Sequence, residues 1–253
     1  MNFHSFIIPL TLAFLAGLST TIGSTVFFLI KDFKKSYLSY FMGFSAGVMI
    51  YLSFVELFPR SVESVGMLKT NIFFFLGFLA IGVIDTLIPH HYISENGTET
   101  DLKKHPLLRT GLMVAFGLML HNIPEGVAVS MSSLADSQLG YLLALAIAAH
   151  NIPEGIAVAV PIYYATKKRA TAFKYSFLSG MSEPFGALLA LTILAPFLTP
   201  ALLSYVFAFV AGVMVFICFD ELLPCCFKYG HGHVAISGII TGMALIALTT
   251  FFL

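Results

Sequence analysis

Charged residues are scarce in this chain of 253 residues, and their scarcity excludes a water-soluble protein. Asp, Glu, Lys and Arg make up 10% of the sequence and hydrophobic residues 58%, whereas soluble domains hold about 25% and about 45–50%. A chain of this length has too little interior to hide so much apolar surface, so the excess must face lipid. Because segments in lipid must satisfy their backbone groups internally, the long apolar runs predict an all-α integral membrane protein surrounded by membrane lipid.

Three other features are absent or rare. The 13 Lys and Arg balance the 13 Asp and Glu, so the chain lacks the excess positive charge that nucleic-acid binding requires. The 3 cysteines, Cys218, Cys225 and Cys226, lie too close together for a disulfide framework, and we expect free thiols. The phosphate-binding Gly-x4-Gly-Lys-Ser/Thr motif is missing, so any transport must be driven by gradients or membrane potential. We expect no prosthetic group.

Eight apolar stretches are each long enough to cross a bilayer as a helix, which takes about 20 residues. They cover residues 6–30, 37–58, 70–92, 107–132, 138–162, 171–196, 199–223 and 232–253. Eleven of the 13 Lys and Arg residues fall in or beside the loops that follow the first, third, fifth and seventh stretches. Cytoplasmic loops retain basic residues, so we predict eight transmembrane helices with both termini outside the cytoplasm, forming a single polytopic domain over residues 1–253.

The sequence repeats itself at a nearly constant spacing. Residues 46–59 recur as residues 211–224, and residues 14–23 recur more faintly as residues 177–186. The two copies start on opposite sides of the membrane, which predicts a 3+2+3 inverted repeat: a first unit over 6–92, a central helix pair over 107–162 and a second unit over 171–253. Secondary transporters built on inverted repeats hold their substrate near the bilayer midplane, where the repeats meet.

The central helix pair carries a duplicated motif. His-Asn-Ile-Pro-Glu-Gly occurs at 121–126 and again at 150–155. Its His and Glu are four residues apart and share one helical face, so two adjacent antiparallel copies can converge. An ionised group at mid-bilayer costs at least about 2.5–3.5 kcal/mol, a cost that a divalent cation offsets. Imidazole and carboxylate ligands suit Zn²⁺, Fe²⁺, Mn²⁺ and Co²⁺. We therefore predict metal ligation by His121, Glu125, His150 and Glu154, with Asn122 and Asn151 as weak, exchangeable ligands.

Other ionisable residues in the apolar stretches are secondary candidates. Glu183 lies mid-span, and its repeat counterpart is the uncharged Thr20, so we interpret it as a functional addition. Glu56 near the outer mouth, and Asp220 with Glu221 near the inner mouth, can serve metal access and release; a scaffold or dimer-contact role is an equal alternative. His231 and His233 near the inner surface can receive departing metal, or can belong to a solvated end of the helix. Asp85 is interpreted as structural.

The duplicated hexapeptide, the Ser182-Glu183-Pro184 segment and the eight-helix plan resemble the ZIP (Zrt/Irt-like) family of divalent-metal transporters over nearly the whole chain. The resemblance is strongest to bacterial broad-specificity zinc uptake permeases, which implies location in a bacterial inner membrane. It implies import of zinc, and also of iron, manganese, cobalt and cadmium, by a homodimer. It further implies a binuclear midplane site, in which His121, Glu125, His150 and Glu154 hold one metal and Asn122, Asn151 and Glu183 hold the second while sharing the glutamates.

The resemblance also implies that helices 1, 4, 5 and 6 move against helices 2, 3, 7 and 8. Some relatives carry a long His-rich loop between helices 3 and 4. Here that loop holds only His90, His91 and His105, which does not favour a role as a metal sensor.

Two alternatives belong to other functional classes. A membrane-embedded dinuclear metalloenzyme has precedent in four-helix carboxylate sites, but these use Glu-x-x-His rather than the His-x-x-x-Glu order found here. A proton or alkali-cation exchanger can also be built on inverted repeats, but Na⁺ and Ca²⁺ prefer sites made only of oxygen ligands, which paired histidines do not supply. The sequence therefore favours a transporter of divalent transition metals over an enzyme.

Overall fold

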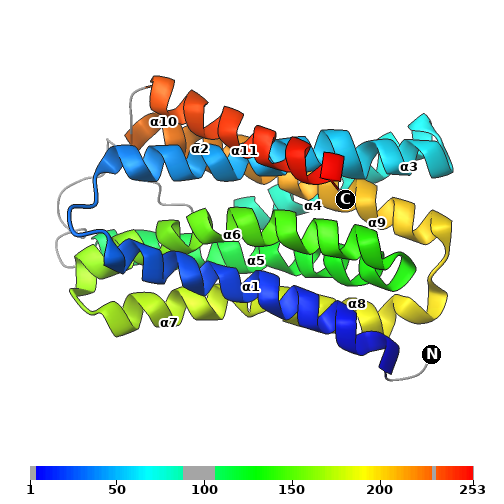
Figure 1. Cartoon of the computed structure of the whole chain (residues 1–253), viewed down its shortest axis with the longest axis horizontal. Coiled ribbons are helices and arrows are strands. Elements are labelled where there is room, and N and C mark those ends of the chain that lie inside the picture. The colour runs from blue at the N-terminus through cyan, green and yellow to red at the C-terminus, as the bar shows by residue number, and fades with distance from the viewer. Residues whose placement is uncertain (1–3, 88–105, 230–231, 253) are drawn as a thin grey trace.

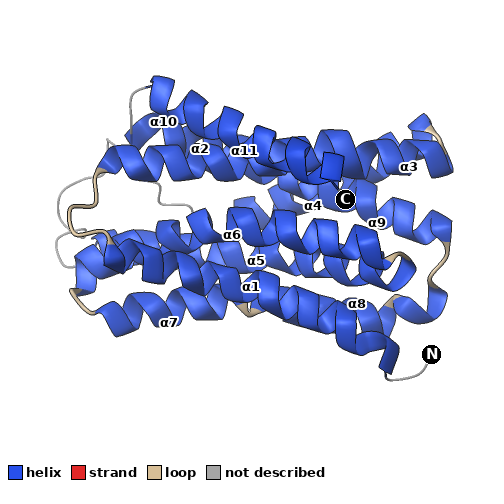
Figure 2. Ribbon diagram, in the orientation of Figure 1, coloured by secondary structure: helices blue, strands red, loops and turns tan. Residues whose placement is uncertain are grey.

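The structure, a computed structural model, describes residues 4–87, 106–229 and 232–252 (Figure 1). Within these ranges the chain forms helices joined by short loops and contains no strand (Figure 2). The elements are α1 (His4–Leu29), α2 (Lys35–Tyr51), the π-helix η1 (Leu52–Leu57), α3 (Phe58–Val65), α4 (Met67–Leu87), α5 (Pro106–Ala135), α6 (Ser137–Thr166), α7 (Arg169–Gly180), α8 (Ser182–Ile193), the 3-10 turn η2 (Ala195–Phe197), α9 (Pro200–Ile217), the π-helix η3 (Cys218–Leu222), α10 (Leu223–Tyr229) and α11 (Gly232–Phe252).

Seven helical segments in the described residues are long and apolar enough to cross a membrane. They are Ser5–Leu29, Lys35–Val65, Met67–Thr86, Ser137–Thr166, Arg169–Ile193, Pro200–Lys228 and Gly232–Phe251. Large apolar side chains such as Phe75, Leu79, Ile240 and Leu248 are exposed on the bundle surface, which suits contact with lipid. The all-α membrane fold is therefore confirmed. The eighth span stays a prediction; it corresponds to α5, which lies beside α6 and carries the first copy of the polar motif.

The helices form two groups that lie one above the other in Figure 1. The first group contains α1, α5, α6, α7 and α8, and its most extensive contacts are α1 with α6, α5 with α6, and α5 with α8. The second group contains α2, α3, α4, α9, α10 and α11, in which α2 packs against α11 and α4 against α9. Contacts of α2 with α6 and of α5 with α9 join the groups. The division coincides with the one implied by the family resemblance, whereas the relative movement stays a prediction.

The packing follows the inverted repeat. α1 packs on α6, and its counterpart α8 packs on α5. α2 packs on α11, and its counterpart α9 packs on α4. A β-carbon at Gly47 would collide with the carbonyl oxygen of Ile239 on α11, and one at Gly212 with that of Phe74 on α4. Gly47 and Gly212 are 165 residues apart, and so are Phe74 and Ile239. α4 and α11 therefore correspond to each other, although their sequences show no repeat.

The second span of each repeat unit changes helix type at the same place. η1 precedes Pro59 and η3 precedes Pro224, and both segments widen into a π-helix. Proline has no N–H and its ring clashes with the carbonyl four residues earlier, so the regular hydrogen-bond ladder cannot continue through it. Single π-turns of this kind occur often at functional sites. They place Glu56 and Glu221 at equivalent positions of the two repeat units.

We predict that Gly47→Ala and Gly212→Ala each lower the midpoint of thermal unfolding of the purified protein. Each added methyl group must push a backbone carbonyl of a neighbouring helix aside, and such overpacking costs about 1–3 kcal/mol. Gly232→Ala is the matched control because a β-carbon there has no neighbour within 4 Å. Equal unfolding midpoints for all three variants would contradict the tight helix crossings described above.

Candidate metal site

The two copies of the hexapeptide lie side by side on α5 and α6, and each histidine faces the glutamate of the other helix. His121 Nε2 lies 3.2 Å from Glu154 Oε2, and His150 Nε2 lies 3.0 Å from Glu125 Oε1. All four side chains are at most 1% exposed. The two polar faces therefore meet inside the bundle, as their spacing predicted.

The hydrogen bonds of His150 define where its proton lies. Its Nδ1 is 3.2 Å from the carbonyl oxygen of Ala146, and because a carbonyl can only accept, Nδ1 carries a hydrogen. Its Nε2 and the Glu125 carboxylate, 3.0 Å apart, would repel each other as two bare acceptors. When no cation lies between them, a proton must therefore do so, and a cation that binds Nε2 has to displace it.

These four residues form pairs rather than a ready-made coordination shell. Across the described ranges, no three His, Cys, Asp or Glu side chains are grouped so that they could hold one metal ion. In each pair the histidine Nε2 and one carboxylate oxygen are hydrogen-bonded to each other. The four-ligand set implied by the resemblance is thus not preformed, and the pairs must open for these residues to ligate a metal together.

The asparagines of the motif use their amide hydrogens and keep their oxygens free. Asn122 Nδ2 donates to the carbonyl oxygen of Ser179 at 3.1 Å, and Asn151 Nδ2 donates to that of Ala16 at 3.0 Å. Ala16 and Ser179 are equivalent in the two repeat units, so the two bonds obey the inverted symmetry. Both amide oxygens point away from these bonds and are available as neutral ligands.

Glu183 joins this cluster from a break in its helix. The sixth apolar stretch was expected to be one continuous span, but the helix is interrupted at Met181, and Glu183 stands in the first turn of α8. Free N–H groups at a helix N-terminus favour a carboxylate there. Asn151 Nδ2 donates to Glu183 Oε2 at 2.7 Å. Thr20, the repeat counterpart of Glu183, stays within the continuous helix α1.

Two glycines of the motif bring these helices into contact. A β-carbon at Gly126 would collide with the carbonyl oxygen of Glu183, and one at Gly155 with that of Thr20. Only a residue without a side chain allows α5 and α8, and likewise α6 and α1, to approach so closely. The glycine of each hexapeptide thus allows the close helix approach that brings Glu183 beside Asn151, one of the predicted ligands.

Unpaired buried polar atoms gather at this cluster. Leaving such an atom without a partner costs about 1–3 kcal/mol, so each one calls for an explanation. In the part of the chain that the structure describes, buried side-chain atoms with no hydrogen-bond partner include five from the predicted ligands: His121 Nδ1, Asn122 Oδ1, Glu125 Oε2, Asn151 Oδ1 and Glu183 Oε1. Four of the five are oxygens, which can bind a cation but cannot donate to one another.

The predicted residues at the two mouths differ in their distance from this cluster. Glu56 is 5% exposed and accepts a hydrogen bond from Arg60 Nε at 3.0 Å, so it belongs to an ion pair at the α3 end of the bundle. Glu221 lines a small cavity with Asp85, Gly117 and Leu120, and it lies near enough to His121 and Asp220 to interact with them electrostatically. The structure thus brings Glu221 next to the motif and leaves Glu56 apart from it.

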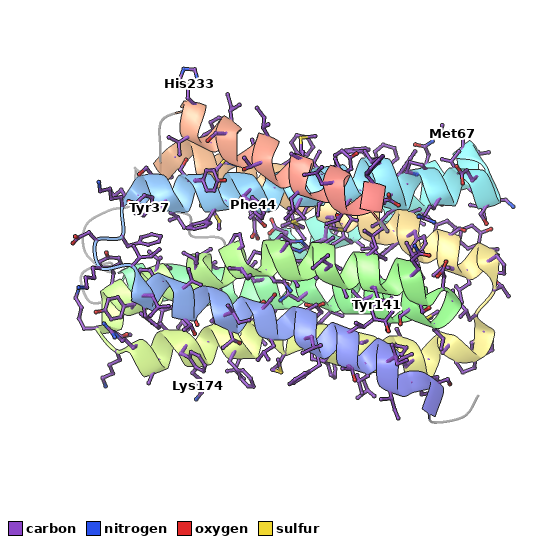
Figure 3. The ribbon with its side chains drawn as sticks, viewed as in Figure 1. Tyr37, Phe44, Met67, Tyr141, Lys174 and His233 are labelled. Carbon is purple, nitrogen blue, oxygen red and sulfur yellow. The ribbon has the colours of Figure 1, made fainter. Side chains whose placement is uncertain are left out.

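Of the other histidines considered above, His233 lies among the described residues and is not part of the cluster. His233 is exposed at the start of α11 and points away from the bundle (Figure 3). His231, His90, His91 and His105 lie outside the described residues. Cys218, Cys225 and Cys226 are free thiols, as predicted.

One residue of the second group that touches the site was missed by the sequence analysis. Ser45 on α2 is buried, and its Oγ donates to Glu154 Oε1 at 3.3 Å. A single serine inside an apolar helix most often bonds to its own backbone or packs, so nothing in its neighbourhood distinguished it. A comparison of the two repeat units could have identified Ser45, because its counterpart in the other unit is the apolar Val210.

Comparisons with known proteins give a consistent result. A family profile described as "ZIP Zinc transporter" matches residues 88–250. The chain is 48% identical over 258 residues to "Zinc transporter ZupT" of Chlorobium luteolum, covering 96% of this chain and 97% of the relative. It is 47% identical over 247 residues to the protein of the same description from Streptococcus mutans, covering 93% of each. With that of Clostridium perfringens it shares 42% identity over 275 residues, covering 98% of this chain and 96% of the relative.

Proposed function

The chain belongs to the ZIP family of zinc transporters, and from this premise we propose that it carries zinc into the cytoplasm through a two-metal site at the seam of α5 and α6. Membership of the family makes it a multi-pass membrane protein and a transporter, so the metalloenzyme alternative is wrong. The exchanger alternative is disfavoured because the two histidines at the seam are nitrogen ligands, which alkali cations do not favour.

One observation carries the proposal: buried His–Glu pairs and unpaired oxygens converge on one seam. Such a cluster is costly inside a membrane unless a cation binds to it. Opening the two pairs frees imidazole and carboxylate for one divalent ion. The second ion takes the oxygen donors, and the two sites share the glutamates; the predicted ligands are His121, Asn122, Glu125, His150, Asn151, Glu154 and Glu183.

The donor set also supports a range of metals. Imidazole nitrogen with carboxylate and amide oxygen suits Zn²⁺, Fe²⁺, Mn²⁺ and Co²⁺ without selecting sharply among them. We propose that iron, manganese, cobalt and cadmium are carried as further substrates, and that each metal is cargo rather than a resident cofactor. The asparagine amide oxygens at the seam are weak, exchangeable ligands, so the ion can be released again.

We propose eight transmembrane helices with both termini outside the cytoplasm, arranged as units 6–92, 107–162 and 171–253 of one domain. α1 begins and α11 ends toward the same end of the bundle, which supports an even number of spans (Figure 1). The placement of basic residues supports the orientation. A protein of this kind is expected to work as a homodimer in a bacterial inner membrane.

The path of the ion follows from this orientation. Glu56 serves the outer mouth, and Asp220 and Glu221 receive the ion on the cytoplasmic side of the seam. Glu221 suits this role because its Oε1 lies against Gly117 on α5, four residues before His121. We propose that His231 and His233, which follow this span in the sequence, receive the ion after it leaves the seam. An inside-negative potential favours inward movement, because it is worth about 2.3 kcal/mol per elementary charge per 100 mV.

We predict that His121→Gln and Glu154→Gln each abolish uptake of radioactive Zn²⁺ into proteoliposomes while the protein is still produced and inserted. Loss of residues that merely orient metal ligands costs about 10–100-fold, and loss of a ligand itself should cost at least the upper value. Glu63→Gln is the matched control, because Glu63 is an exposed glutamate on α3 outside the cluster. Uptake by either seam variant at the rate of the control would contradict the proposal.

Zinc binding should release protons. The proton held between His150 and Glu125 must leave when His150 Nε2 binds the metal. We therefore expect calorimetry in buffers of different ionisation enthalpy to register at least one proton released per protein, and the affinity to fall between pH 7.5 and pH 5.5 as protons compete for the same lone pairs. An affinity that stays constant over this range would argue against ligation by these pairs.

A further inference from the structure

Ser45 marks a point at which the inverted symmetry of the site fails. α2 packs against α6 just as its counterpart α9 packs against α5. On α2 the buried Ser45 donates a hydrogen bond to Glu154 Oε1 at 3.3 Å. The equivalent position on α9 is Val210, which is equally buried and has no group to donate. Glu154 on α6 thus has a hydrogen-bond partner in the second helix group, whereas the inverted repeat provides no such partner for Glu125 on α5.

The two glutamates consequently differ in what they can offer an arriving cation. Glu154 uses both oxygens, Oε1 toward Ser45 and Oε2 toward His121. Glu125 uses only Oε1, toward His150, while its Oε2 is buried without a partner. A hydrogen bond to a carboxylate oxygen occupies one of its lone pairs and fixes the orientation of the carboxylate, whereas a buried oxygen without a partner gains the most from an arriving cation.

We propose that Ser45 is a positioning residue that withholds Glu154 from the metal, so that Glu125 captures the ion first and Glu154 closes on it second. The inference rests on the proposed function and adds the order in which the ligands engage. Ser45 belongs to the second helix group and Glu154 to the first, so the step in which Glu154 turns toward the ion also breaks a bond between the groups.

The first test is the zinc affinity of the purified full-length protein, measured by calorimetry. Ser45→Ala frees Glu154 Oε1 and should tighten binding about tenfold, which corresponds to about 1.4 kcal/mol. In proteoliposomes the same variant should lower the KM for zinc without raising the maximal rate. Ser45→Thr keeps the hydroxyl and should behave like the natural protein. A residue that only packed between helices would alter protein yield or maximal rate and leave the affinity unchanged.

The reciprocal variant keeps the inference testable even if Ser45→Ala fails to fold. Val210→Ser introduces a hydroxyl at the symmetry-related position beside α5, where it can engage the free oxygen of Glu125, and should weaken zinc binding by a similar factor. Unchanged affinity in Ser45→Ala or in Val210→Ser overturns the proposed order of capture while uptake by the natural protein still stands. A natural protein that neither binds nor takes up zinc overturns the proposed function itself.

Discussion

The arrangement of the whole site depends on keeping imidazole and carboxylate groups paired in a bundle surrounded by lipid. His121 with Glu154, and His150 with Glu125, lie within hydrogen-bond distance and are almost fully buried. A lone ionised group in such a place is expensive, and removal of one partner from a buried ion pair costs about 3–5 kcal/mol. A divalent cation can replace the shared protons because it offers more positive charge to the same atoms. The pairing therefore joins α5 to α6 and, under the proposed function, determines the conditions under which metal binds.

The inverted repeat places equivalent residues on the two sides of this site, and the positions at which the repeat units differ make the two sides unlike. Equivalent contacts recur throughout: Asn122 and Asn151 bond to equivalent carbonyls, and Gly126 and Gly155 admit equivalent helices. A fully symmetric seam would treat the two sides of the membrane alike. The exceptions are a carboxylate where the other repeat has Thr20, and a hydroxyl where the other repeat has Val210. Both bear on residues of the proposed site, Glu183 and Glu154, so the two sides of the seam do not present the same side-chain atoms.

The sequence was sufficient for features that depend on composition or on local spacing. Long apolar runs predicted the helices, and the four-residue separation of His and Glu predicted that the two polar faces would meet. Features that depend on contacts between distant segments were not readable: the glycine crossings that join α2 to α11 and α9 to α4 emerge only from the structure, and the bond from Ser45 to Glu154 links residues 109 positions apart. The helix break at Met181 was also missed, although Gly180 and Pro184 on either side of it could have indicated one, because apolar residues resume beyond Pro184 and give the stretch the length of a single span.

The most direct test of the account is anomalous X-ray scattering from crystals of the protein grown or soaked with zinc. We expect two anomalous peaks between α5 and α6, with the first coordinated by imidazole and carboxylate atoms of the duplicated motif and the second next to Glu183. Zinc found only at surface residues such as His233, with the His121–Glu154 and His150–Glu125 pairs still closed, would contradict the claim that these pairs are the transport site.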